Sequence, residues 1–182
     1  MAAATAGQVN GDGHGDGPGG GLRAHLRARL RDGASFLGAV EYSSVMVAPA
    51  ATLDDEAQRE AWGITLENLY YALLCLMSAE AGLVVGRPVP LAEVLQASDR
   101  HHCGALFRDL LTDFTHHADC RLARLSPGGR ITLLSLLTQA LRVSFGNLLA
   151  LDDGLDAEAT AELQTSLDGL SRRLARHTIG ER

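Results

Sequence analysis

The chain has 182 residues, of which 46% are hydrophobic and 21% are charged, and its formal net charge is −6. These values are typical of one globular domain, and the acidic balance argues against a nucleic-acid partner. Aromatic residues make up only 4% of the chain. A core built from Leu, Ala, Val and Ile instead favours helices over strands.

The first 20 residues include a run rich in Gly, Asp and His. Such a segment cannot bury enough apolar surface to offset the entropy lost on ordering, so a disordered tail is predicted. The run lacks the apolar stretch of a signal peptide. Sparse cysteines, odd in number, are typical of reduced thiols, which predicts a cytoplasmic protein with the nucleus as the alternative; they are Cys75, Cys103 and Cys120.

The first predicted helix covers residues 22–32. Leucines recur along it at every fourth position, and arginines form a parallel stripe, as in an amphipathic helix. Gly33 stands where a glycine commonly ends a helix. The arginine stripe is either the wet side of a core helix or a docking surface for an anionic membrane or a partner's groove; its members are Arg23, Arg27 and Arg31.

The next helical stretch is predicted to bend at Gly63, to resume over residues 65–81 and to end at Gly82. Its second half is apolar around most of its circumference. That distribution is typical of a central helix with neighbours on several sides. A short helix over residues 91–97 follows, with Pro90 preset for its first turn.

The C-terminal half contains a clear helix start at Ser126 and Pro127, because serine caps a helix and proline fits its first position. The most apolar stretch of the chain, residues 131–151, comes next. A turn over residues 152–154 then leads into a last helix over residues 156–177. Its leucines are spaced by four, three and four residues, which predicts a one-sided apolar stripe.

These patterns predict an all-α fold, in which residues 21–178 form a single bundle of six to seven helices around one or two apolar central helices. Residues 1–20 and 179–182 are the two tails. Two apolar stretches approach the length of a membrane span, but Glu67 interrupts the first and Arg142 the second. Charged side chains are costly inside a bilayer, so no transmembrane segment is predicted.

Histidines and cysteines gather in two short clusters between residues 101 and 120. One helical face would present His116 and Cys120 to a metal ion, and His102 with Cys103 would complete a zinc site. The helical pattern between the clusters separates them by about 20 Å, which works against closure. No cofactor is therefore predicted, and zinc binding by these four residues is kept as an alternative.

The function expected from the residues is that of a non-enzymatic interaction module. The sequence contains no Gly-x-Ser-x-Gly, His-Glu-x-x-His or phosphate-loop motif, so an enzyme is not predicted. One-sided helices instead favour a regulatory or adaptor protein that binds a protein partner. A homo-oligomer, such as a homodimer, is the other alternative, through the stripe Leu163, Leu167, Leu170 and Leu174.

Two fragments carry a resemblance: Leu106-Phe107-Arg108-Asp109 is like the helix end of a known signature, and Gly129-Arg130-Ile131 opens the apolar helix. Over residues 64–151 the chain resembles a divergent viral member of the B-cell-lymphoma family of apoptosis regulators, although the Asn-Trp pair of that family's signature is missing. The resemblance implies an inhibitor of host apoptosis or innate signalling with a groove for a partner's amphipathic helix. It implies that Arg130 pairs with an acidic side chain and that the groove is bordered by Leu106, Phe107, Leu110, Arg130 and Leu134.

Overall fold

The computed structural model describes residues 18–43, 56–100 and 125–179. This part of the chain is all-helical and contains no strand, which confirms the predicted fold class, but its five helices do not confirm a bundle of six or seven. The helices are α1 (Pro18–Glu41), α3 (Glu56–Val85), α4 (Leu91–Arg100), α6 (Pro127–Leu151) and α7 (Ala157–Ile179).

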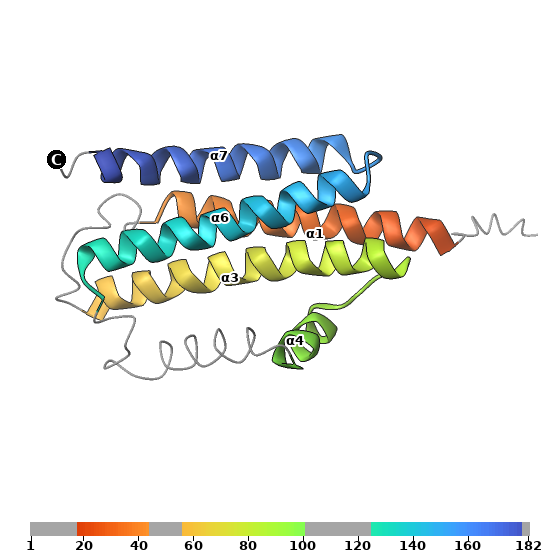
Figure 1. The fold of residues 1–182 in the computed structure, drawn as a ribbon, viewed down its shortest axis with the longest axis horizontal. Coiled ribbons are helices and arrows are strands. Elements are labelled where there is room, and N and C mark those ends of the chain that lie inside the picture. The colour runs from red at the N-terminus through yellow and green to blue at the C-terminus, as the bar shows by residue number, and fades with distance from the viewer. Residues whose placement is uncertain (1–17, 44–55, 101–124, 180–182) are drawn as a thin grey trace, which may run out of the picture.

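Four long helices lie side by side and form the body of the molecule, and the short α4 packs outside them (Figure 1). Helix α1 contacts α3 and α7, and α6 contacts the same two helices. Helix α4 contacts α3. The order α1, α3, α6, α7 therefore closes a ring around a shared core.

The core is one cluster of buried, mainly aliphatic side chains drawn from all four long helices. Trp62 of α3 and Leu134 of α6 are fully buried in it. A smaller cluster joins α4 to α3, where Val89 and Val94 pack against Tyr70 and Leu74. Both apolar stretches of the sequence are therefore long helices of the bundle, as their composition predicts.

Helix α1 is longer than its sequence pattern predicts. It begins at Pro18, inside the segment expected to be a tail, and it runs through Gly33 without a break. The prediction that Gly33 ends the helix is therefore wrong. A Cβ atom on Gly33 would lie 3.5 Å from Leu163 Cδ1 and 3.8 Å from Cys75 Cβ, so this glycine lies where three helices approach closely.

Helix α3 is continuous through Gly63 and ends at Val85. The prediction of a stop at Gly82 is wrong, because the glycine in the left-handed conformation is Gly86, with φ of +71°. The amide groups of Gly86 and Arg87 both donate to the Gly82 carbonyl oxygen, at 2.9 and 3.2 Å. Gly82 itself is buried.

The starts of α6 and α7 follow local sequence signals. The Ser126 side chain accepts a hydrogen bond of 3.1 Å from the Gly129 amide, and Pro127 occupies the first turn, which confirms the predicted start. Asp156 caps α7 in the same way, accepting from the Ala159 amide at 2.9 Å. That hydrogen bond, followed by the Arg27 guanidinium, lowers the pKa of Asp156.

Candidate interaction surface on helix α6

Helix α6 turns one side toward the core and leaves the other exposed. Buried positions recur along one side from Arg130 to Leu148. On the opposite side, Leu136 is 64% exposed and Val143 is 53% exposed. We call this opposite side the α6 face; its exposed members are Thr132, Ser135, Leu136, Gln139, Ala140, Val143, Gly146, Asn147 and Ala150.

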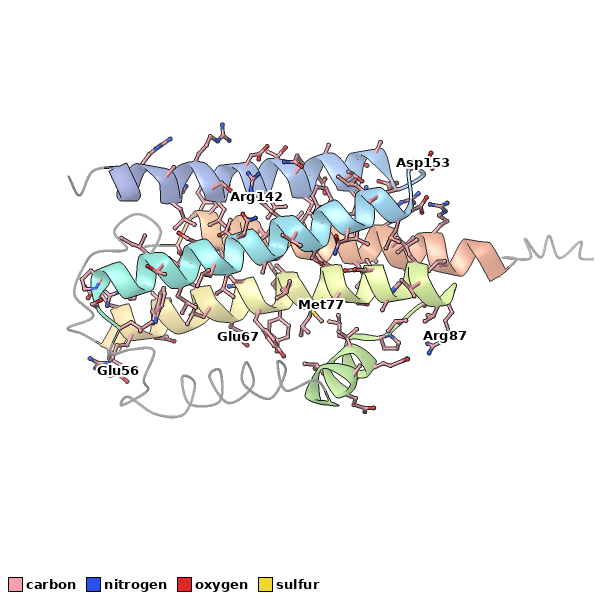
Figure 2. All side chains as sticks on the ribbon, in the orientation of Figure 1. Glu56, Glu67, Met77, Arg87, Arg142 and Asp153 are labelled. Atoms are coloured by element: carbon pink, nitrogen blue, oxygen red, sulfur yellow. The ribbon has the colours of Figure 1, made fainter. Side chains whose placement is uncertain are left out.

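The α6 face carries no charged side chain. Arg142 is the only charged residue between Ile131 and Leu151, and it lies at the edge that meets α7 (Figure 2). Its guanidinium donates to Asp168 Oδ1 at 2.6 Å and to Ser171 Oγ at 2.9 Å. The charge of Arg142 is therefore directed to α7, away from the middle of the face.

The opposite edge of the α6 face is fixed by a polar contact with α3. Ser144 Oγ donates to Glu80 Oε2 at 3.4 Å, and Asn147 Nδ2 donates to Glu80 Oε1 at 3.3 Å. Contacts on both sides of the α6 face therefore fix the rotation of α6 about its axis: Arg142 is bound to α7 on one side, and α6 is bound to Glu80 of α3 on the other. The uncharged residues between them point away from the bundle as a consequence.

The groove residues implied by the family resemblance are placed differently from that expectation. Arg130 is only 3% exposed, and its guanidinium donates to the Leu125 carbonyl oxygen at 3.0 Å. Burial lowers the pKa of Arg130. Leu134 is fully buried in the core, so neither side chain is open to a partner in this structure. Leu106, Phe107 and Leu110 lie outside the described residues.

The leucine stripe of α7 is part of the core. Its four side chains pack in the main hydrophobic cluster with residues of α1 and α6. Because they are buried within one chain, these four leucines are not exposed to a second copy. The stripe is made of Leu163, Leu167, Leu170 and Leu174.

The four zinc-ligand candidates, His102, Cys103, His116 and Cys120, lie outside the described residues. Within residues 18–43, 56–100 and 125–179, no group of three or more His, Cys, Asp or Glu side chains is arranged to hold a metal ion. Cys75 is a buried free thiol, and its burial raises its pKa.

The arginine stripe of α1 forms ion pairs with acidic residues in the turn between α6 and α7 and at the start of α7. Arg27 Nε lies 2.6 Å from Asp156 Oδ2, and Arg31 contacts Glu158 at the same distance. Arg23 pairs with Asp152 and donates to the Gly154 carbonyl oxygen at 2.8 Å. The stripe thus joins α1 to the turn between α6 and α7 and to the start of α7, an arrangement that its spacing alone does not reveal.

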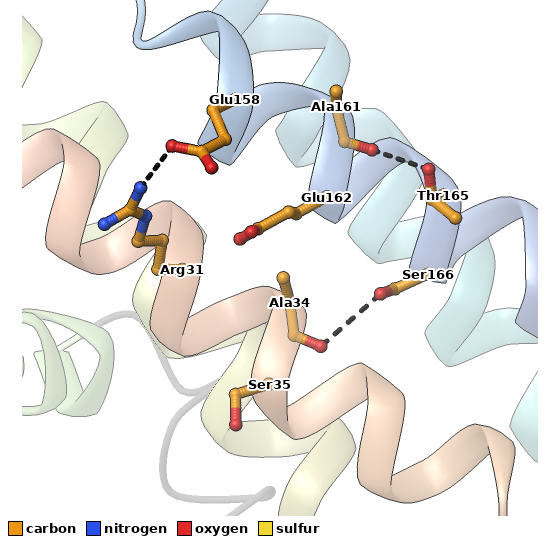
Figure 3. Close-up of a pocket in the computed structure, with 8 residues that line it drawn as sticks. All are labelled: Arg31, Ala34, Ser35, Glu158, Ala161, Glu162, Thr165 and Ser166. Carbon is orange, nitrogen blue, oxygen red and sulfur yellow. Dashed lines mark hydrogen bonds and ion pairs between the residues drawn. The ribbon is translucent and has the colours of Figure 1, made fainter.

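An open groove of about 600 Å³ runs between α1 and α7 (Figure 3). The Arg31–Glu158 ion pair lies at one end of it, and Ser166 Oγ donates to the Ala34 carbonyl oxygen at 3.5 Å across it. Small side chains and two glutamates line it without a histidine, cysteine or aspartate. This groove is a seam between packed helices, and Arg31, Glu158 and Ser166 at its walls are engaged in contacts between α1 and α7.

Helices α3 and α6 are each long and apolar enough to cross a membrane. This is weak evidence for a membrane span, because core helices of soluble proteins share that length and composition. Half of the most apolar window of α3 is buried, against 39% of that of α6. The lower buried share of α6 is consistent with the exposed α6 face.

Comparison with protein-family models, with curated proteins and with solved structures gives no match for this chain. The resemblance to the B-cell-lymphoma family therefore stays a prediction based on two short fragments. One of them, residues 106–109, lies outside the described residues, and the other, residues 129–131, forms the capped start of α6.

Proposed function

We propose that this protein is a non-enzymatic helical interaction module that binds an apolar helix of a protein partner on the α6 face. The observation that carries this proposal is the exposure of Leu136 and Val143 on a helix side without a charged residue. Charged residues are common elsewhere in the chain, which has 16 basic and 22 acidic residues among 182, so their absence from this side of α6 stands out. Exposed apolar surface that stays uncharged is typical of the centre of an interface.

The geometry of the α6 face suits a helical partner. Leu136 and Val143 are two helical turns apart, so they project from the same side of α6 at a spacing of about 10.5 Å. An amphipathic helix presents its own apolar side chains at intervals of three, four and seven residues. Small neighbours such as Ala140 and Gly146 leave room for a second backbone to approach.

The family resemblance extends this proposal to a pathway. On that basis the partner is a helix of the host machinery of apoptosis or innate signalling, and the protein is its viral-type inhibitor in the cytoplasm. The α6 face would then take the docking role that the resemblance assigns to a groove beside Arg130, since Arg130 is buried.

The proposal is tested by selecting binders from a phage-displayed library of helical peptides. Enriched peptides should carry apolar residues at helical spacing, because the face offers only apolar and small polar contacts. Binding should be lost in the double variant Leu136→Glu and Val143→Glu. The matched control is the double variant Ile64→Glu and Val84→Glu, which places the same two charges on exposed apolar positions of α3 and should bind as the wild type does.

Two results would contradict the proposal. One is a selection that enriches no helical peptide. The other is a set of peptides that bind wild type and the Leu136→Glu and Val143→Glu double variant equally, since binding would then occur elsewhere on the molecule.

A further inference from the structure

We infer that the α6 face pairs with the α6 face of a second copy of this chain, in an antiparallel arrangement with two-fold symmetry. This inference rests on one part of the proposed function, the α6 face as a docking surface, and it names a second copy of the chain as the occupant of that face. The pairing would be isologous, with the same patch used by both copies. It is separate from the leucine stripe of α7, whose side chains are buried.

Charge is the first argument for a second copy. The chain carries a net charge of −6, so two copies repel each other on average. The α6 face has no acidic residue, and Arg142 at its edge is paired with Asp168. An uncharged face is complementary to another uncharged face, and two copies can approach there without bringing unpaired charges together.

The distribution of large and small residues is the second argument. In an antiparallel pairing centred near the middle of α6, Leu136 of one copy lies against Gly146 and Ala150 of the other. Val143 then lies against Ala140 and Gln139 of the second copy. Leu136 thus meets the small residue Gly146, and Val143 meets the small residue Ala140 beside Gln139. Large side chains opposite small ones are the requirement for side chains of one helix to enter the spaces of another.

Gly146 has the space that this pairing needs. A Cβ atom built on Gly146 meets no other atom within 4 Å in the single chain. No packing inside the bundle therefore requires a glycine at this position, and glycine weakens the interior of a helix. In the proposed dimer, this glycine would make room for the Leu136 side chain of the second copy.

The expected dimer is weak, because a single pair of helices buries less area than most stable interfaces. A dissociation constant on the order of 10 to 1,000 μM is consistent with so small an interface. Sedimentation equilibrium of the full chain should therefore cover about 5 μM to about 1 mM, a range that brackets these values. The wild-type mass should rise from 19.3 kDa toward that of the dimer.

The variant that tests the pairing is Gly146→Leu. It adds apolar surface to the face but fills the space for Leu136, so the dissociation constant should rise by about tenfold or more. Gly21→Leu is the matched control, because Gly21 is also an exposed helical glycine with no atom within 4 Å of a built Cβ. It should associate as the wild type does, and both variants should keep the circular dichroism of the wild type.

The inference is overturned if wild type keeps the monomer mass at the highest concentration. It is also overturned if Gly146→Leu associates as well as wild type, since contact would then depend on apolar area alone. A third result would separate the two proposals: wild type stays monomeric, and helical peptides bind wild type but not the Leu136→Glu and Val143→Glu double variant. Pairing with a second copy would then be refuted, while the proposed docking face would be supported. If wild type dimerises through Gly146 and selects no peptide, the inference holds and the foreign partner is refuted.

Discussion

Two leucines with opposite environments provide a quantitative test of the fold. Leu167 of α7 is 1% exposed within the main core cluster, whereas Leu136 of α6 is 64% exposed. Changing Leu167 to Ala removes buried methyl groups and leaves a cavity, which costs about 2.5 to 5 kcal/mol of unfolding free energy. The same change at Leu136 removes little buried surface and creates no cavity, so its cost should be below about 0.5 kcal/mol.

Urea unfolding followed by circular dichroism measures both changes. The protein should be kept at about 0.5 μM, at least about 20-fold below the dissociation constant expected for the dimer, so that association contributes little. The two variants should share the wild-type dependence on urea and differ in midpoint. Equal losses at Leu167 and Leu136, or a loss below about 1 kcal/mol at Leu167, would refute the assigned orientation of α7 and α6.

Three further outcomes follow from polar contacts. Ser126→Ala should lower the free energy of unfolding by about 1 kcal/mol, because it removes the cap of α6; a thermal melt with no change would contradict this. Burial lowers the pKa of His25, so as the pH falls the histidine is protonated in the unfolded chain before it is protonated in the folded one. The free energy of unfolding should therefore decline below about pH 6.5. His25→Gln should flatten this decline, which urea midpoints across the pH range would show. A double-mutant cycle on Arg27→Ala and Asp156→Ala should give a coupling that shrinks from low to high salt, because the pair is exposed; coupling that salt does not change would contradict that geometry.

Signals confined to a few neighbouring residues predict this structure well. The cap and proline at the start of α6 act within one turn, so Ser126 and Pro127 are sufficient to locate it. The apolar stretch 131–151 likewise predicts a helix of the bundle, because helical periodicity and burial are both visible in composition. The outward α6 face could have been found from the same stretch, since it contains a single charged residue, Arg142.

Glycines are where the sequence misleads. Gly33 and Gly82 both follow helical patterns, and a glycine there commonly ends a helix. In the structure Gly33 lies beside Leu163, far away in the chain, and Gly82 is buried inside α3. A glycine that ends a helix and a glycine that admits a neighbouring helix differ only in tertiary contacts, which sequence spacing does not contain.

The candidate site residues show the same limit. The spacing of Leu163 and Leu167 predicts an apolar stripe but does not tell whether one chain or two will cover it, and the structure covers it within one chain. The sequence likewise predicts that Arg27 lies on a charged stripe, but it does not predict the partner Asp156, which approaches Arg27 only because α7 packs against α1. The burial of Arg130 also depends on contacts beyond its own helix.

The central claim is that α6 turns one side into the core and leaves an uncharged side open for docking. It is tested most directly by thiol labelling of Leu136→Cys and Leu134→Cys, with mass spectrometry separating these sites from the natural cysteines. At about 0.5 μM protein, at least about 20-fold below the expected dimer dissociation constant, position 136 should react as an exposed thiol. Position 134 should react at least about 100-fold more slowly, because its reaction requires local opening. Equal rates at the two positions would contradict the claim.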